Sequence, residues 1–182
     1  MAAAYACSQE STCLKRKVGA IVVDSSGSII SSGRNDVPRD SRSCSSVYGK
    51  CYKDYFREQF VESAINEKLI TKNKKQGFIK LLKDKIGLHD ICQAVHAEEN
   101  VILNLTRTGS MVPLETCTLY TTTYPCRQCA RRIVNLGIKR ICYLEAYPDE
   151  AAAKILEDAN VGTKLFEGIT FRAYFRIYGE KK

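Results

Sequence analysis

Apolar and polar positions follow two different periods along the chain, and together they predict strands alternating with helices. A β-rich apolar run at 18–23 is joined by a polar turn to a returning strand at 28–33. Further strands are predicted at 116–122 and 139–144. Helices are predicted at residues 2–16, 95–105, 125–137 and 148–157. This alternation indicates an α/β layered sheet whose later strands run parallel.

The pattern changes between about residues 39 and 90. Cysteines and tyrosines come first, and a polar helical stretch follows. Residues 66–85 hold seven lysines against Glu67 and Asp84, a net charge of +5. We interpret this region as an insertion in a single domain that spans residues 1–182. A solvated helix face is the expected role of the lysines, with phosphate contacts as the alternative. The aromatic tail at 166–178 fits either a helix or a strand.

Composition narrows the class of protein. A chain of 182 residues with 45% apolar and 26% charged residues is typical of one globular domain. No apolar stretch approaches the roughly 18 residues of a membrane span, and no secretion leader is recognisable, so a cytoplasmic protein is expected. The net charge of +8 weakly favours an anionic ligand.

Nine cysteines against two histidines are the unusual feature of the composition. Disulfides are rare in a reducing compartment, so these cysteines are expected to be core residues, nucleophiles or metal ligands. Cys117 and Cys142 fall in predicted strands and are expected to be core thiols.

Two short motifs at the starts of predicted helices carry the chemistry. One places Glu98 two residues after His96, and the other places Cys126 directly after Pro125 and three residues before Cys129. Cysteines at i and i+3 share one helix face, so both sulfurs can reach one ion. With His96 they supply the three protein ligands of a catalytic zinc site, whose fourth position takes water.

Glu98 is expected to move protons rather than to bind the metal. Zinc lowers the pKa of a bound water from about 16 to about 7, and a nearby carboxylate can pass the proton to a leaving amine. His-x-Glu followed by Pro-Cys-x-x-Cys is the signature of the zinc nucleobase deaminases. A redox motif or a structural zinc knuckle would account for Cys-x-x-Cys but not for Glu98 or Pro125.

These motifs and their surroundings resemble the cytidine deaminase superfamily, and within it the deoxycytidylate (dCMP) deaminase family. The resemblance covers most of the chain, at residues 11–20, 33–38, 95–100, 123–130 and 137–143. It implies a three-layer α/β/α fold around a mixed five-stranded sheet and a bound Zn²⁺.

The resemblance also suggests residues for the substrate. Asn35 matches an asparagine that hydrogen-bonds the sugar, and Tyr147 matches a tyrosine that lines the pocket. Arg39 and Arg127 are candidate phosphate partners because guanidinium forms forked, charge-assisted bonds. A turn asparagine, a packing tyrosine and surface arginines are the structural alternatives.

In some phage-type members a second, structural zinc joins three segments, and cysteines lie in the same three places here. The spacing before the catalytic histidine differs from that of the family, so the ligands do not match one by one. Its candidate ligands here are Cys13, Cys44 or Cys51, and Cys92 or His89. Such a site would stabilise an insertion with little apolar content. Inert cysteines are the alternative.

Two features depart from compact family members. The insertion is larger, and residues 145–149 and 166–175 resemble the deaminase domain of bacterial anti-phage deoxycytidine nucleotide deaminases. A P-loop kinase-like domain precedes the deaminase in those proteins, but no Gly-x-x-x-x-Gly-Lys-Ser/Thr occurs here. The chain is therefore either an excised domain or a free-standing relative.

The expected function is zinc-dependent hydrolysis of a deoxycytidine nucleotide, dCMP or dCTP, to the deoxyuridine nucleotide, with a role in anti-phage nucleotide depletion. The resemblance implies a homo-oligomer and a deoxynucleotide triphosphate effector. One alternative is a deaminase of cytosine in single-stranded DNA or of adenosine in tRNA, which the charge suits. The basic residues are not interleaved with aromatic residues in one compact patch, which counts against a nucleic-acid deaminase. The other is a non-catalytic zinc sensor of nucleotides.

Overall fold

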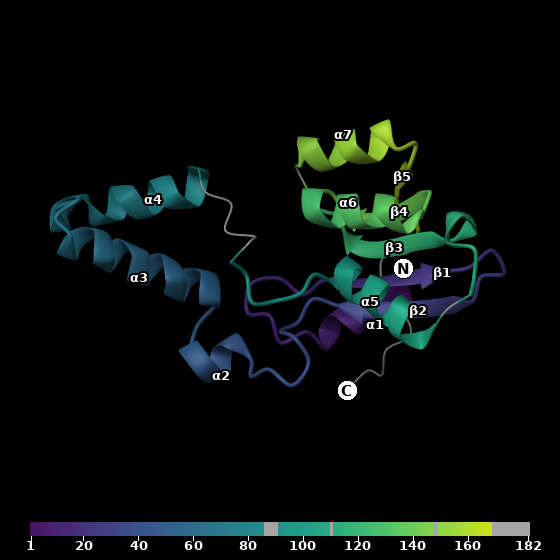
Figure 1. Cartoon of the computed structure of the whole chain (residues 1–182), viewed down its shortest axis with the longest axis horizontal. Coiled ribbons are helices and arrows are strands. Elements are labelled where there is room, and N and C mark those ends of the chain that lie inside the picture. The colour runs from purple at the N-terminus through teal and green to yellow at the C-terminus, as the bar shows by residue number, and fades with distance from the viewer. Residues whose placement is uncertain (86–90, 110, 148, 169–182) are drawn as a thin grey trace. The chain divides into compact units, whose positions relative to one another are not determined.

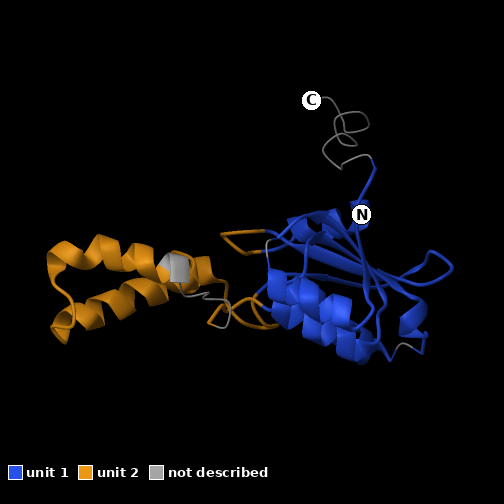
Figure 2. Cartoon of the chain, turned by 90° about the horizontal axis from the view of Figure 1, so that it is seen from above, with its two compact units in different colours: residues 1–11, 17–36, 95–182 blue, residues 12–16, 37–94 orange. Residues whose placement is uncertain are grey.

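The computed structural model describes residues 1–85, 91–109, 111–147 and 149–168, and the chain divides into two compact units (Figure 2). Unit 1 comprises Met1–Ser11, Lys17–Asp36 and Val95–Lys182, and unit 2 comprises Thr12–Arg16 and Val37–Ala94. Among the described residues, no helix combines the length and the apolar character that a bilayer crossing requires.

Unit 1 is built on a mixed five-stranded sheet, as the sequence analysis expected (Figure 1). Its strands are β1 (Gly19–Val23), β2 (Ile29–Arg34), β3 (Thr118–Thr123), β4 (Arg140–Glu145) and β5 (Gly162–Leu165), in the order β2-β1-β3-β4-β5. Only β1 runs against its neighbours, since it pairs antiparallel with β2 and β3 while β3, β4 and β5 pair in parallel. The carboxyl ends of the other four strands therefore lie at one edge of the sheet.

Helices cover both faces of this sheet. They are α1 (Ala2–Gln9), α5 (Ala97–Thr108), α6 (Arg127–Leu136) and α7 (Glu150–Asp158), with a short 3₁₀ turn, η2 (Leu114–Thr116). Gly19 on β1 lies against α1, and Gly33 on β2 lies against α5. Gly33 pairs with Ala20, the neighbour of Gly19, and adjacent strand residues point to opposite faces. Helices α1 and α5 thus form outer layers on opposite faces, which confirms the three-layer architecture.

The core of unit 1 lies between the sheet and helices α5, α6 and α7. Its largest fully buried side chains include Val22, Leu119, Ile133, Ile141 and Leu156. They come from strands β1, β3 and β4 and from helices α6 and α7, and Val101 of α5 belongs to the same cluster, so α5, α6 and α7 share one face of the sheet. This packing fixes the two helices whose first turns carry the predicted motifs.

Several predicted boundaries shift. The first helix ends at Gln9 rather than at residue 16, because Ser11 is buried and its hydroxyl donates to the backbone oxygen of Asn35. Pro125 lies one residue before the N-cap Cys126 instead of at the first helical position. The last predicted helix begins at Glu150, where Asp149 caps it. The sequence analysis did not predict strand β5. All four of its residues are exposed, so no apolar pattern marks the strand in the sequence. Most of the aromatic tail lies outside the described residues.

Unit 2 contains most of the predicted insertion and is helical. Its elements are α2 (Cys44–Tyr48), α3 (Tyr52–Asn66), the 3₁₀ turn η1 (Lys72–Lys74) and α4 (Lys75–Lys85). Val61, Ala64 and Leu82 are its buried apolar side chains on α3 and α4. Asp36 and Val95, the unit 1 residues that flank the insertion, exchange two backbone hydrogen bonds of 3.1 and 2.8 Å.

The close approach of α5 to β2 yields a prediction for stability. A Cβ on Gly33 would lie 2.6 Å from the Ala97 carbonyl oxygen and 2.6 Å from the Val101 amide nitrogen, both on the backbone of α5. We expect Gly33→Ala to lower the free energy of unfolding by about 1–3 kcal/mol, as overpacking does, in urea denaturation followed by circular dichroism. Gly162→Ala is the matched control, since its new Cβ would lie 3.7 Å from the backbone oxygen of Lys139, an ordinary van der Waals distance. Equal losses in both variants would contradict this account of the α5 contact.

Candidate functional site

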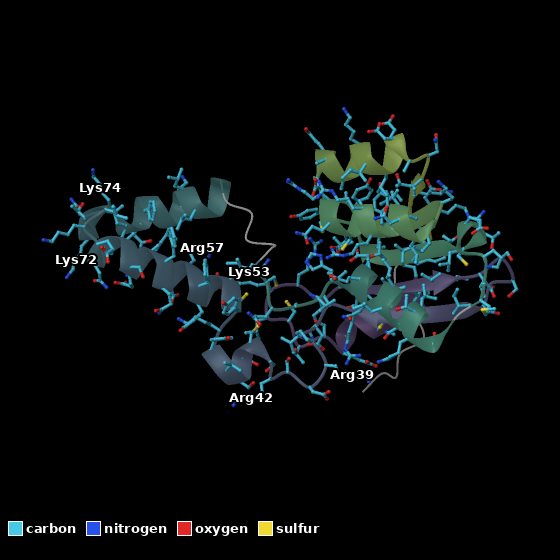
Figure 3. All side chains as sticks on the ribbon, in the orientation of Figure 1. Arg39, Arg42, Lys53, Arg57, Lys72 and Lys74 are labelled. Atoms are coloured by element: carbon cyan, nitrogen blue, oxygen red, sulfur yellow. The ribbon has the colours of Figure 1, made fainter. Side chains whose placement is uncertain are left out.

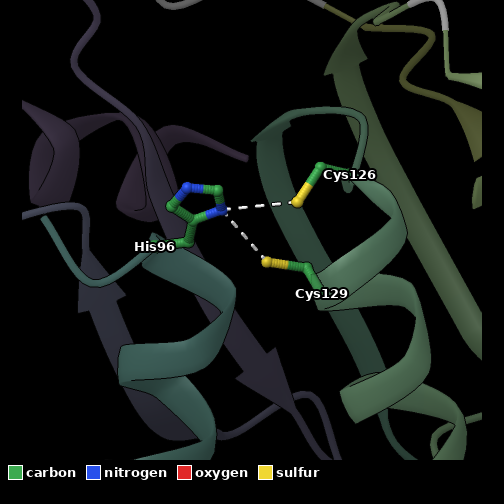
Figure 4. A group of neighbouring side chains, drawn as sticks. All are labelled: His96, Cys126 and Cys129. Carbon is green, nitrogen blue, oxygen red and sulfur yellow. Dashed lines mark hydrogen bonds between the residues drawn. The ribbon is translucent and has the colours of Figure 1, made fainter. Parts of the chain in front are cut away.

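The two predicted motifs meet at the edge of the sheet where β2, β3 and β4 end. His96 is the N-cap of α5, Cys126 is the N-cap of α6, and Cys129 lies in the first turn of α6 (Figure 4). Both helices therefore direct their amino ends, with the partial positive charge of the helix dipole, toward these side chains. This arrangement favours thiolates and other anions at the site.

The three side chains fit a zinc ion in distance and in ligand type. His96 Nδ1 lies 3.4 Å from the Sγ of Cys126 and 3.4 Å from the Sγ of Cys129, and the three atoms lie within 4.8 Å of one another. Zinc–nitrogen and zinc–sulfur bonds of about 2.1 and 2.3 Å in a tetrahedron would separate nitrogen and sulfur by about 3.5 Å. No other group of three potential ligand atoms among the described residues is as close.

Hydrogen bonds among the three ligands shift their pKa values in different directions. Hydrogen bonds from Cys129 and His96 outweigh burial and lower the pKa of Cys126 to about 3. The bond with Cys126 raises the pKa of Cys129, and burial adds to this effect. The same partner raises the pKa of His96, although burial acts against it. Cys126 is thus a thiolate at neutral pH, the form in which cysteine binds metals.

Glu98 lies beside this group, deep in unit 1. Its side chain is buried, with 4% of the residue exposed. Its Oε2 lies 3.6 Å from Cys129 Sγ, and its Oε1 lies 3.1 Å from the hydroxyl of Thr121 on β3. Burial raises the pKa of Glu98, despite the opposing effect of His96 and of the Thr121 hydrogen bond. A carboxyl group with a raised pKa is suited to accept a proton and to return it near neutral pH.

The sequence analysis missed two residues that support the site. Thr121 forms a hydrogen bond with Glu98. In the sequence it could have been noticed as a polar residue that shares a strand face with the apolar Leu119. Asp149 accepts hydrogen bonds from the backbone amides of Arg127, at 3.1 Å, and Ala152, at 3.0 Å, so it links the starts of α6 and α7. These bonds lower the pKa of Asp149 although burial alone would raise it. In the sequence, Asp149 could have been found because aspartate is a preferred residue at a helix N-cap.

The predicted substrate residues have different surroundings. Asn35 directly follows β2 and is buried, and its Oδ1 accepts a 2.7 Å hydrogen bond from the Val18 amide. Tyr147 follows β4 at the same edge of the sheet and is half-buried. Arg127 is the first residue of α6 and pairs with Asp149 at 3.8 Å. Arg39 is exposed and belongs to unit 2.

Four further cysteines line one small cavity of about 20 Å³ within unit 2, and they are Cys13, Cys44, Cys51 and Cys92. All four were candidate ligands of a second zinc, whereas His89 lies outside the described residues. The cavity has the volume of about one water molecule. No three of the four sulfurs lie within 4.8 Å of one another, unlike the ligand atoms around His96. Cys117 and Cys142 were expected to be core thiols. Cys117 directly precedes β3 and is buried, and Cys142 lies in β4 and is half-buried.

Comparison with known families settles the class of protein. The cytidine and deoxycytidylate deaminase zinc-binding region matches residues 1–145, which include both motifs. The chain belongs to this family. It is therefore a zinc-dependent deaminase and a hydrolase, as the sequence analysis expected.

Named relatives support the same assignment. The deoxycytidylate deaminase of Enterobacteria phage T4 is 35% identical over 156 residues, which cover 79% of this chain and 75% of that protein. The deoxycytidylate deaminase of Saccharomyces cerevisiae is 29% identical over 157 residues, covering 86% of this chain but 40% of its relative. The resemblance to dCMP deaminases seen in the sequence is thus confirmed.

A solved structure agrees with the fold. The dCMP deaminase of cyanophage S-TIM5, crystallised with dCMP and dUMP, superposes with a TM-score of 0.59 at 22% identity over 90% of this chain and 91% of that one. At this level of identity the likeness bears on the fold alone, and it confirms the deaminase-like α/β architecture.

The ligand geometry predicts how zinc content responds to substitution. We expect His96→Ala to lower bound zinc by about one equivalent per chain, measured by inductively coupled plasma mass spectrometry, because two ligands hold the ion far more weakly than three. Glu98→Gln should keep its zinc, since Glu98 is not placed as a ligand. Cys142→Ser is a matched control outside both cysteine groups. Unchanged zinc in His96→Ala would show that the ion is held elsewhere.

Proposed function

We propose that the chain hydrolyses the amino group of a free deoxycytidine nucleotide, with dCMP as the substrate and dUMP and ammonia as the products. The observation that carries this proposal is the buried Glu98, which lies beside the group formed by His96, Cys126 and Cys129. The phage T4 relative is named a deoxycytidylate deaminase, and the cyanophage neighbour was crystallised with dCMP and dUMP. Extension of the activity to dCTP stays a prediction from the resemblance.

His96, Cys126 and Cys129 would hold the zinc ion, with the histidine ligating through Nδ1. When bound, zinc acts as a Lewis acid that activates water for attack near neutral pH. The two helix amino ends stabilise the negative charge that the thiolates bring to the site. The burial of Cys129 and of Glu98 limits bulk water there.

Glu98 carries the protons of the reaction. Water adds to C4 of the cytosine ring while the carboxylate accepts a proton from it and delivers a proton to the ring and then to the departing amino group. The C4–N bond breaks, ammonia leaves, and the ring keeps the new oxygen. The Thr121 hydroxyl lies 3.1 Å from Oε1 of Glu98 and 3.0 Å from the Thr123 carbonyl oxygen, so it helps to keep the carboxylate in one orientation while it gains and loses protons.

The sugar and phosphate contacts follow from the same edge of the sheet. The Val18 amide donates to Oδ1 of Asn35 and so orients this side chain, which would contact the sugar. Tyr147 would line the base pocket where β4 ends. Arg127 is the candidate for the 5′-phosphate in unit 1, whereas Arg39 stays a prediction from the sequence.

The first test is turnover of purified zinc-loaded protein. We expect conversion of dCMP to dUMP, separated by chromatography, and a loss of kcat of at least about 100-fold in Glu98→Gln. Deoxycytidine, dCTP and a cytosine-containing oligonucleotide are assayed in parallel to fix the phosphate requirement.

Each outcome of this assay decides between functions. Conversion of the oligonucleotide alone would move the activity to nucleic-acid editing. Nucleotide binding without turnover, unchanged in Glu98→Gln, would identify a sensor. In both cases the proposed reaction would be wrong.

We also propose a second, structural zinc held by Cys13, Cys44, Cys51 and Cys92. Four thiols on one cavity large enough for an ion support it, and thiolate sets of this kind hold structural zinc in many small domains. Binding would draw the sulfurs closer than they lie without the ion. It would stabilise unit 2, whose helices bury few apolar side chains.

Zinc stoichiometry and stability test this second site together. We expect about two zinc ions per chain, one of which Cys51→Ser removes while dCMP turnover persists, with a lower unfolding temperature for unit 2. Cys7→Ser, a cysteine of unit 1, should keep both ions. A wild-type content of one zinc, all of it lost with His96→Ala, would rule out the second site.

Four other expectations rest on the resemblance and stay predictions. They are the homo-oligomer, the deoxynucleotide triphosphate effector, the cytoplasmic location and the anti-phage role.

A further inference from the structure

Almost all of the chain's excess positive charge belongs to unit 2. Its residues, 12–16 and 37–94, carry fourteen lysines and arginines against seven aspartates and glutamates, a net charge of +7 out of +8. Unit 1, which holds the proposed deaminase site, is close to neutral at +1. A ligand that this charge attracts would therefore bind unit 2.

Many of these cations are available to a ligand. Arg39, Arg42, Lys72 and Lys74 are exposed, and none of them forms an ion pair within the described part of the chain. They occur at both ends of the unit, since the arginines precede α2 whereas the two lysines lie in η1, between α3 and α4 (Figure 3). Positive charge thus follows the length of unit 2 instead of filling one compact anion site.

An aromatic stripe runs along α3 between these cations. Tyr52, Phe56 and Phe60 are spaced four residues apart and share one helix face. Phe60 stacks on Phe78 of α4, with ring centroids 6.3 Å apart and planes inclined by 14°. Phe56 and Phe60 nevertheless stay 37% and 48% exposed, although they are large apolar side chains. The unit therefore leaves aromatic rings in contact with solvent.

Charge on α3 is sorted around this stripe. Lys53 follows Tyr52 by one position, so it borders the stripe at about 100° around the helix. Arg57 follows Phe56 in the same way, but its side chain is only 13% exposed and is paired with Asp54 at 2.9 Å. Glu58 and Glu62 follow Phe56 and Phe60 by two positions, which places them about 200° away, on the opposite side. Lys53 thus borders the rings, and Glu58 and Glu62 lie away from them.

We propose that unit 2 binds single-stranded nucleic acid on the aromatic stripe and the exposed cations of the unit, independently of the deaminase site. Exposed rings accept bases by stacking, and cations spread along the path accept the phosphates. Two units of charge +7 repel each other, which disfavours a second copy of this chain as the partner. Gln59 and Ser63 interrupt the rings with polar groups, which suits bases and sugars better than the interior of a membrane.

The test uses the full zinc-loaded chain and fluorescein-labelled dT12, which contains no cytosine or adenine and so cannot be deaminated. Anisotropy titrations should show binding at low salt that weakens as salt rises. Four phosphate contacts would give a slope of about −3 for log K against log salt, because each contact contributes about −0.7 for single strands.

Matched variants separate stacking from charge and from misfolding. We expect Phe56→Leu/Phe60→Leu, which keeps apolar volume, and Lys72→Glu/Lys74→Glu each to weaken dT12 binding at least tenfold while dCMP turnover is unchanged. Arg107→Glu/Lys154→Glu makes the same charge change on exposed residues of unit 1 and should leave dT12 binding nearly unaffected. Because dT12 binding and dCMP turnover are read separately, failure of either proposal is distinguishable from failure of the other.

Several results would overturn the proposal. These are no binding at low salt, equal loss in the unit 1 and unit 2 charge variants, or full binding by the double leucine variant. Equal competition by poly-glutamate of matched charge would instead assign the surface to acidic proteins. Preferential binding to vesicles containing phosphatidylserine would assign it to membranes.

Discussion

The distance between α5 and β2 controls the geometry of the whole site. Strand β2 and helix α5 can approach this closely only because Gly33 has no side chain, and its backbone lies directly against the first turns of α5. That approach sets the depth of His96 and Glu98, since both belong to the start of the same helix. The ligand group forms because α6 begins at the same edge of the sheet and brings its two cysteines to His96.

Burial of a carboxyl group costs solvation free energy, and in this site the same burial raises the pKa of Glu98 toward the range that proton transfer requires. Glu98 has lost most of its water, which raises its pKa, and it retains only a few partners such as the Thr121 hydroxyl. Buried polar groups need such partners to be tolerated at all. The same environment keeps the carboxyl close to the protonation balance that a proton carrier requires, and it holds the group against the metal ligands.

The insertion is attached in a way that leaves this geometry intact. Asp36 and Val95 are joined by two backbone hydrogen bonds, so the chain leaves and re-enters unit 1 at neighbouring points. Closing a longer loop between fixed ends costs little additional entropy, so a large insert is tolerated there. The division of charge follows the same boundary, with a nearly neutral unit 1 and a strongly basic unit 2.

The sequence by itself determined the family, the mixed sheet and the residues that could hold zinc and move protons. It could do so because His96, Glu98, Cys126 and Cys129 lie in two local motifs whose spacing is set by helix geometry. Only the tertiary structure decided that Thr121 holds Glu98, that Arg39 belongs to unit 2, and that four scattered cysteines share one cavity. It also brought the aromatic rings and cations of α3 onto one surface, which the sequence analysis had not expected. The first three relations join residues far apart in the chain, so no local period reveals them. The four-residue spacing of the rings is a local period, but their exposure is decided by tertiary packing.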